Sequence, residues 1–200
     1  MKKFFNITFS LITVTLLLFS CAQAPTPKVS YYLLNAPEHN LAGDNEQTVV
    51  GGEHKVAGDH KIILDNVILP QYLKQSSIVM LMNENQLHYA RYHLWGESLQ
   101  QGITKLIKQA LTITNKQQSL HLTIEIDHFY PTDQTNVILS GRYWLSMTEA
   151  EVKNNQYVFN FAFKQALKAD GYGQAVKQMH VLIKQLAAQI NQHVVAFNSN

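Results

Sequence analysis

The strongest regularity in the chain is an apolar stripe near its C-terminus. Its residues recur every three or four positions, as they do on one face of an α-helix. They are Val176, Met179, Ile183, Leu186, Ala187, Ile190, Val194 and Phe197. A second stripe with the same spacing consists of Leu99, Ile103, Leu106, Ile107, Ala110 and Leu111. The two stripes predict two amphipathic helices, each with one buried face.

Short β-prone segments fill most of the remaining chain, and turn residues separate them. We expect strands at 30–35, 61–69, 77–82, 87–93, 120–127, 137–147 and 157–163. The last of these alternates Tyr157, Phe159, Phe161 and Phe163 with other residues, so we expect this row to be the densest part of the buried side. One helix follows each run of strands, which predicts an α+β domain: a mixed β-sheet of about six strands with both helices on one face.

The length of 200 residues favours one domain, which we place at residues 30–200. Residues 36–60 contain four glycines and little apolar pattern, so we expect a loop there. Loops this long inside a compact domain are uncommon and are typically mobile or functional. We predict a mobile loop and leave a functional role open.

The N-terminus has the features of a lipoprotein signal. Lys2 and Lys3 precede an apolar run at 7–19, which is shorter than the roughly 20 residues that a membrane-spanning helix needs. The sequence up to Ser20 and Cys21 resembles the bacterial lipoprotein box. This resemblance implies cleavage of a signal peptide at residues 1–20, between Ser20 and Cys21. It also implies a diacylglyceryl group on the Cys21 sulfur and acylation of the new amino group, typically by palmitate.

Residues 21–29 then form the lipidated cysteine and a flexible tether with two prolines. In lipoproteins of this kind an aspartate after the cysteine commonly signals retention in the inner membrane. Ala22 stands there, which favours the outer membrane with the domain on the periplasmic side. The alternative is an ordinary secretory signal followed by a buried thiol.

Charge and cysteine content exclude several classes of protein. Sixteen Lys and Arg against fourteen Asp and Glu, with no basic run, argue against a nucleic-acid partner. The single cysteine excludes an intramolecular disulfide framework and cysteine-rich metal motifs. The covalent lipid on Cys21 is the one attached group that we expect, with no other cofactor.

Candidate catalytic and metal-binding residues lack the required spacing. The nine histidines form no zincin-type pair, so we expect no metal and interpret them as surface or partner-facing residues. Glu125 and Asp127 share one face of a predicted strand but have no cleft to perturb them, and we expect Asp170 to cap a turn or helix start. No Gly-x-Ser-x-Gly elbow is present. We therefore predict that the protein is not an enzyme; a periplasmic hydrolase would need a buried convergence of His, Ser and acid side chains.

Several motifs, taken in order, resemble one known family. They are Tyr31-Tyr32-x-Leu34, Val67-x-Leu69-Pro70-x-Tyr72-Leu73 followed by Ile78-Val79, Trp95-x-Glu97-x-Leu99, Gly141-x-x-Trp144, and Asp170-Gly171-Tyr172. Over residues 31–190 the chain resembles the ABC-type transport auxiliary lipoproteins, which include the outer-membrane component of the paraquat-inducible Pqi system.

The resemblance implies a role in intermembrane phospholipid transport rather than a reaction. An outer-membrane lipoprotein of this kind would dock an MCE-domain tunnel protein that extends from inner-membrane transporter components. The motif residues Tyr32, Pro70, Tyr72, Trp95, Trp144 and Tyr172 are candidate partner contacts, with packing or turn roles as the competing interpretation. Homo-oligomerisation is left open. The alternative function is an envelope scaffold lipoprotein that binds outer-membrane β-barrel machinery or peptidoglycan.

Overall fold

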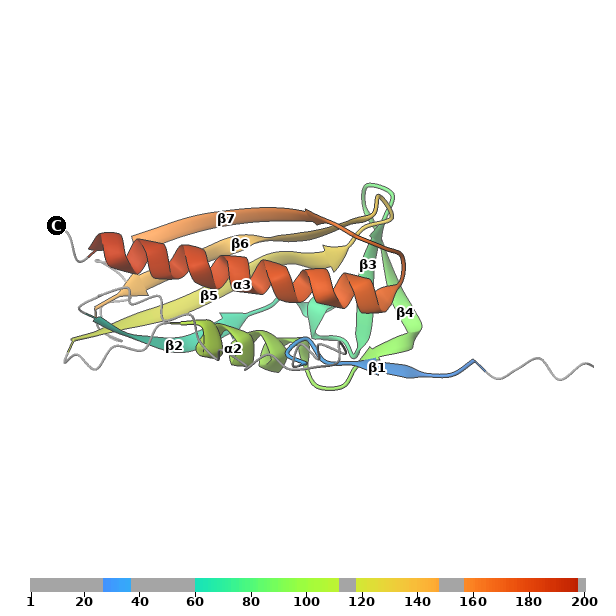
Figure 1. Cartoon of the computed structure of the whole chain (residues 1–200), viewed down its shortest axis with the longest axis horizontal. Coiled ribbons are helices and arrows are strands. Elements are labelled where there is room, and N and C mark those ends of the chain that lie inside the picture. The colour runs from blue at the N-terminus through green and yellow to red at the C-terminus, as the bar shows by residue number, and fades with distance from the viewer. Residues whose placement is uncertain (1–26, 37–59, 112–117, 148–156, 198–200) are drawn as a thin grey trace, which may run out of the picture.

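The computed structural model describes residues 27–36, 60–111, 118–147 and 157–197, which contain seven strands, two α-helices and one 3-10 helix (Figure 1). The elements are β1 (Ser30–Tyr32), β2 (His60–Ile68), η1 (Gln71–Lys74), β3 (Ser77–Met82), β4 (Gln86–Trp95), α2 (Leu99–Ala110), β5 (Gln118–Pro131), β6 (Asn136–Ser146), β7 (Tyr157–Ala166) and α3 (Tyr172–Phe197). The predicted α+β class and the two helices are confirmed, and each predicted strand is present. The expected loop at 36–60 lies almost wholly outside the described residues.

The strands form two sheets rather than the single sheet of about six strands that the sequence predicts. Sheet A has the order β1-β4-β3 and sheet B the order β2-β5-β6-β7. Both sheets are mixed, because β1 runs parallel to β4 and β2 runs parallel to β5. The sheets touch where Leu81 of β3 bridges Thr132, immediately after β5 ends at Pro131. Proline lacks the N–H that a strand ladder needs, which fits a break between the sheets at this point.

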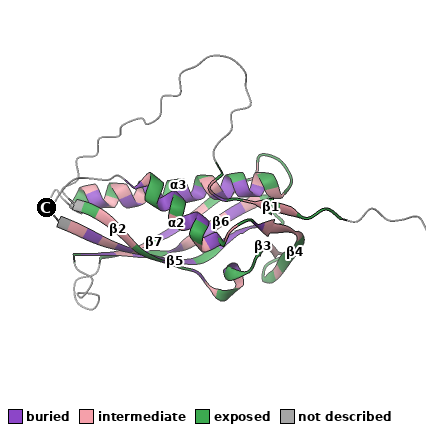
Figure 2. Cartoon of the chain, turned by 90° about the horizontal axis from the view of Figure 1, so that it is seen from below, coloured by how far each residue is buried: buried purple, intermediate pink, exposed green. Residues whose placement is uncertain are grey.

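Helix α3 connects the two sheets. At 1.5 Å per residue its 26 residues span about 39 Å, enough to pass over both. Tyr172 at its start stacks on His93 of β4, whereas His193 near its end lies against Tyr143 of β6. Helix α2 packs beside it, and Asn191 of α3 donates a hydrogen bond to the carbonyl of Ala110 at 3.0 Å. Both helices lie on the same side of the sheets, as predicted (Figure 2).

The expectation that the aromatic row of β7 is the densest buried part is wrong. Phe161 is buried, but Phe159 and Phe163 are only partly buried and Tyr157 is 51% exposed. The reason is the position of β7 at the edge of sheet B, where a neighbouring strand packs against one side only. The densest packing lies one and two strands further in, at fully buried residues such as Leu122, Ile124 and Leu139.

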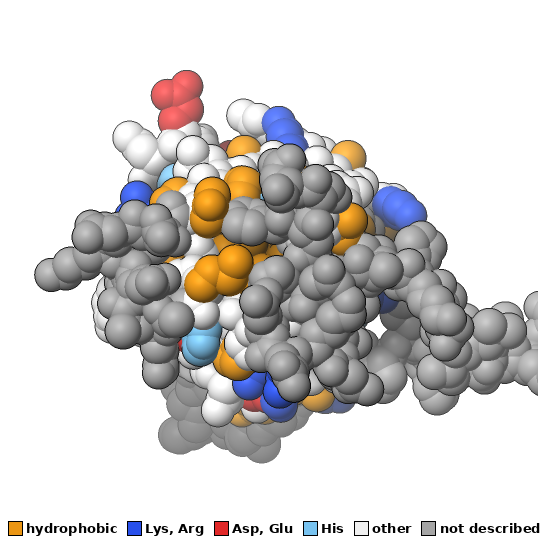
Figure 3. Space-filling view, turned by 90° about the vertical axis from the view of Figure 1, so that its left-hand side faces the viewer, with side chains coloured by type: hydrophobic (Ala, Val, Ile, Leu, Met, Phe, Trp, Pro, Cys, Tyr) orange, Lys and Arg blue, Asp and Glu red, His pale blue; other side chains and the backbone are white. Residues whose placement is uncertain are grey.

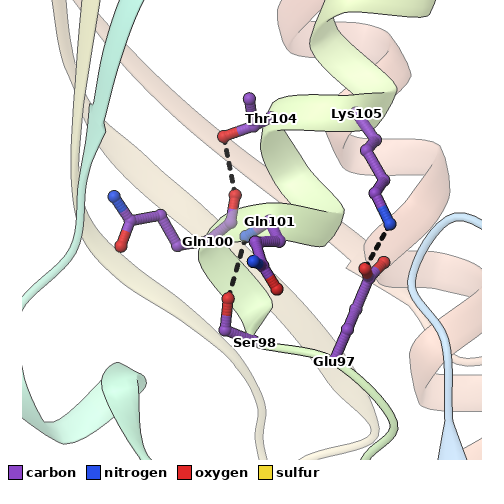
Figure 4. A network of polar contacts seen from close by, with 6 residues as sticks. All are labelled: Glu97, Ser98, Gln100, Gln101, Thr104 and Lys105. Atoms are coloured by element: carbon purple, nitrogen blue, oxygen red, sulfur yellow. Dashed lines mark hydrogen bonds and ion pairs between the residues drawn. The ribbon is translucent and has the colours of Figure 1, made fainter.

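A polar network fixes the start of α2 (Figure 4). The Ser98 hydroxyl accepts a hydrogen bond from the Gln101 N–H at 3.3 Å, as an N-cap residue does. Glu97 forms an ion pair with Lys105, and the Thr104 hydroxyl donates to the Gln100 carbonyl at 2.7 Å. The Trp95-x-Glu97-x-Leu99 motif therefore leads from the end of β4 into a capped helix.

Candidate functional site

The six candidate partner contacts lie in three separate places. The first place contains Tyr32, Trp95 and Tyr172 and lies around β1, the strand that follows the predicted tether. Pro70 and Tyr72 lie at η1, next to β5. Trp144 lies on the face of sheet B that no helix covers. The sequence motifs therefore do not converge on one site.

The first place, the tether junction, consists of Tyr32, Leu34, His93, Tyr172 and His180. The Tyr32 hydroxyl and His93 Nδ1 share a hydrogen bond of 2.8 Å, and the His93 ring stacks on Tyr172 with centroids 4.0 Å apart. Burial raises the pKa of the Tyr172 hydroxyl, and the nearby Tyr32 adds to this shift. These contacts join β1, β4 and α3, the three elements nearest to the tether.

Leu34 completes this junction. Its side chain is buried, and its carbonyl accepts a hydrogen bond from His180 Nδ1 of α3 at 2.9 Å. Tyr32 lies opposite Trp95 in the pairing of β1 with β4, and Trp95 is buried. Tyr32, Trp95 and Tyr172 thus help to attach β1 to β4 and α3, which agrees with the packing interpretation of these motif residues.

The second place lies against a bulge in β5. The pairing of β5 with β6 shifts between Ile126 and His128, which leaves Asp127 as the additional residue. The Tyr72 hydroxyl donates a hydrogen bond to the Asp127 carbonyl, and the Tyr72 ring lies 6.3 Å from that of Tyr130. Burial, with a smaller contribution from Tyr130, raises the pKa of Tyr72 well above its usual value. Pro70 precedes η1 in an extended conformation, so this pair holds η1 against sheet B.

The third place is the end of sheet B where β6 finishes and β7 begins. Trp144 lies opposite Val158, which is 56% exposed, and Met147 and Tyr157 nearby are 45% and 51% exposed. Trp144 and Val158 have the outer-face parity of sheet B, whereas Tyr157 has the parity of Phe159 and Phe161 on the helix side. The four residues therefore surround this end of the sheet, and we call them the distal patch. Figure 3 views this end of the molecule and shows hydrophobic side chains at its surface. β1, which follows the predicted tether, lies toward the opposite end of the long axis (Figure 1).

The interpretation of the histidines as surface or partner-facing needs correction at four positions. His93, His121, His180 and His193 are half-buried and bond within the chain to Tyr32, Asp65, Leu34 and Tyr143, respectively. Sequence spacing could not reveal these pairs, because their partners lie 50 to 146 positions away. Across the described ranges, no three His, Cys, Asp or Glu side chains are grouped closely enough to hold a metal ion.

The outer face of sheet B contains polar pairs. Arg142 donates to Glu125 at 2.7 Å, and His128 Nδ1 hydrogen bonds to the Ser140 hydroxyl at 3.0 Å. Hydrolytic pairs of this type ordinarily lie in a concave site that holds the substrate. His128 is exposed on an open sheet face, so this pair is a cross-strand contact of the kind that stabilises sheets. At the start of α3 the backbone carbonyl of Gly171 accepts the first-turn hydrogen bonds from the N–H groups of Gln174 and Ala175, so Gly171 occupies the N-cap position. A cap from the Asp170 side chain stays a prediction.

Tyr143 provides a prediction on pH. Its side chain is fully buried, and its hydroxyl shares a 2.6 Å hydrogen bond with His193 Nδ1. Burial raises its pKa to about 12, against 10.0 unperturbed. As the pH rises, the Tyr143 hydroxyl therefore loses its proton in the unfolded chain before it does so in the folded protein. The contribution of the protonated, buried hydroxyl to folding stability is complete below pH 10 and is lost between pH 10 and about 12. Through this residue alone the free energy of unfolding should fall by about 2–3 kcal/mol.

Urea unfolding at pH 8 to 11.5 measures this effect. We expect Tyr143→Phe to make the decrease of the free energy of unfolding with rising pH less steep. The decrease that remains in this variant comes from the other tyrosines with a raised pKa, including Tyr72. Tyr31→Phe is the matched control because Tyr31 is 68% exposed. A decrease of the same slope in Tyr143→Phe and Tyr31→Phe would contradict the prediction.

Ser20 and Cys21 lie outside the described residues, so the lipid attachment and cleavage sites remain predictions from the sequence. No helix in the described ranges is both long enough and apolar enough to cross a membrane.

Comparison with known proteins gives one family. The model of ABC-type transport auxiliary lipoprotein components matches residues 44–191. No curated protein sequence matches significantly. A solved structure of an uncharacterised protein is similar, with a TM-score of 0.63 and 17% identity, covering 84% of this chain and 99% of its own. A Xanthomonas campestris protein of the family model DUF330 has a TM-score of 0.58 and 7% identity, covering 68% of this chain and 84% of its own. At these identities the two structures establish the similarity of fold alone.

Proposed function

Because the chain belongs to the ABC-type transport auxiliary lipoprotein family, we propose that it is the outer-membrane lipoprotein of an intermembrane phospholipid transport system. In this proposal it docks an MCE-type tunnel protein at the periplasmic face and catalyses no reaction. The observation that carries the proposal is the family match over residues 44–191, preceded in the same chain by the lipoprotein box that ends at Cys21. The coarser role, an auxiliary lipoprotein component of ABC-type transport, follows from the family.

We assign docking to the distal patch. A domain tethered at β1 has that end nearest to the membrane, so its opposite end faces the periplasm, from which a tunnel from the inner membrane would arrive. Met147, Tyr157 and Val158 are exposed there, and Trp144 beside them is half-buried. Trp and Tyr are enriched among residues that dominate binding energy in protein interfaces. Trp144 is thus the motif residue that we retain as a partner contact.

Photo-crosslinking in cells tests both the proposed partner and the surface to which we assign it. A photoreactive residue at Met147, in the full acylated protein, should capture an MCE-domain protein. The matched control is Val181 on α3, which is 42% exposed and lies outside the patch. Capture from Val181 but not Met147 would overturn the assigned surface. Capture of outer-membrane barrel-assembly proteins or peptidoglycan, with no MCE protein, would support the envelope scaffold function instead.

A further inference from the structure

The outer edge of β7 is the least protected strand edge in the described part of the molecule. An unpaired edge presents N–H and C=O groups to any strand that can add to it, and proteins ordinarily block such edges with charges, prolines, bulges or covering segments. β7 has ten residues, pairs with β6 without any shift of register, and contains no proline and one charge, Lys164. It forms the upper edge of sheet B in Figure 1.

The other edges are protected. β1 has only three residues. β2 has a bulge between Leu64 and Asn66, and the side chain of Gln100 donates to its Val67 carbonyl at 2.8 Å. β3 meets the segment after β5, where the Asp133 N–H donates to the Leu81 carbonyl at 3.1 Å. β7 therefore differs from every other described edge in being long, regular and without such protection.

The sequence of β7 complements itself. We propose that β7 pairs antiparallel with β7 of a second copy of this chain, about a two-fold axis at Phe161, and joins the two copies of sheet B into one continuous sheet. Directly opposed residues of an antiparallel pair lie on the same face. This register places Phe159 opposite Phe163 on the helix side and Asn160 opposite Ala162 on the outer side.

Charge and packing favour this register. Lys164 lies opposite Val158, so the single charge of the strand does not meet its own copy. A shift by one residue would move the phenylalanines opposite outer-face residues, which the pleat disfavours. Other registers also pair helix-side residues with helix-side residues. Only the register centred on Phe161 places all three phenylalanines of β7 opposite phenylalanines of the second copy. Phe159 and Phe163, only partly buried in one copy, would gain the neighbouring strand that they lack.

Paired cysteines test the register in cells. Asn160 and Ala162 are exposed on the outer face, so each accepts a substitution. Asn160→Cys on one tagged copy, co-expressed with Ala162→Cys on a copy with a second tag, should form a disulfide-linked heterodimer on oxidation. Asn66→Cys, exposed beside the bulge of β2, is the control for random collision, and the unchanged chain controls for Cys21. Linkage of Asn160→Cys to itself in preference to Ala162→Cys would overturn the register.

Matched charge variants test the strength of the pairing. Asn160→Glu with Ala162→Glu places like charges opposite each other twice per dimer, whereas Asn160→Lys with Ala162→Glu places opposite charges there. In the full acylated protein in detergent we expect the first variant to raise the dimer dissociation constant by about tenfold or more and the second to preserve the dimer. Melting temperatures near that of the unchanged protein would exclude unfolding as the cause.

Two outcomes would overturn the proposal. One is a monomeric unchanged protein in sedimentation together with no crosslink between positions 160 and 162 in cells. The other is crosslinking of these positions to a different protein, which would show that a partner's strand occupies the edge. Neither outcome touches the proposed transport function, because that function is tested from Met147.

Discussion

Gly141→Ala is expected to destabilise the protein by at least about 4 kcal/mol, which is among the largest effects of single substitutions. A Cβ at this position would lie 2.1 Å from the Glu125 carbonyl oxygen, 2.9 Å from Ile126 Cα and 3.0 Å from Phe161. The first two are backbone atoms of the neighbouring strand β5, which cannot rotate away as a flexible side chain could. To relieve the contact, β5 and β6 would have to separate next to the bulge at Asp127.

Urea unfolding followed by circular dichroism measures this effect. Gly173→Ala is the matched control, because a Cβ there would meet nothing within 4 Å and the residue lies in the first turn of α3. That variant should be unchanged or slightly more stable, since alanine is the better helix former. Equal stability of Gly141→Ala and the unchanged protein would show that the strands adjust without cost.

Local elements were predictable from the sequence because their signals are local. The apolar stripes of α2 and α3 and the alternation of Leu120, Leu122, Ile124 and Ile126 depend on neighbours within a few positions. β3 has the same bounds in the prediction and in the structure, because charged and amide residues follow it at once. Pro70, which cannot continue a ladder, stands two positions after the last residue of β2.

Pairing between distant segments was not predictable. A break between two sheets depends on which strands become neighbours, and strand periodicity contains no information about that. The Tyr32–His93 and His180–Leu34 contacts join residues 61 and 146 positions apart. Such pairs form only after β1, β4 and α3 have come together. The sequence motifs therefore indicate Tyr32 and Tyr172 separately but not their junction.

One distinction between candidate residues was available from strand parity alone. On β6 the inward positions are Val137, Leu139, Gly141, Tyr143 and Leu145, and Trp144 has the opposite parity, shared with Arg142 and Ser140. A tryptophan in phase with an arginine and a serine is expected on the outer face of a half-buried sheet. Trp95 has the same residue type, yet it ends a strand and is buried. The parity of a residue along its strand therefore distinguishes Trp144, a candidate partner contact, from a core residue, whereas the family motifs alone do not.

Cys21→Ser, placed behind an ordinary cleavable secretory signal, is expected to convert the protein from membrane-bound to soluble in the periplasm. Without residues 1–20 the chain has fourteen basic and fourteen acidic side chains. A neutral domain has little attraction for anionic headgroups, so its membrane residence depends on the acyl chains. Each buried methylene contributes about 0.8 kcal/mol, and two or more acyl chains are needed for stable anchoring. Labelling with palmitate should disappear together with membrane sedimentation.

Ala22→Asp is the control that separates anchoring from sorting. This variant keeps Cys21 and should still incorporate palmitate and sediment with membranes, but it should move to the inner-membrane fraction. In that location the anchor is intact while the distal patch faces away from the inner membrane, so capture of the tunnel protein from Met147 should fall. If the Cys21→Ser variant sediments with membranes as the unchanged protein does, anchoring comes from the folded domain. If Ala22→Asp stays in the outer membrane, the residue after the cysteine does not determine the location.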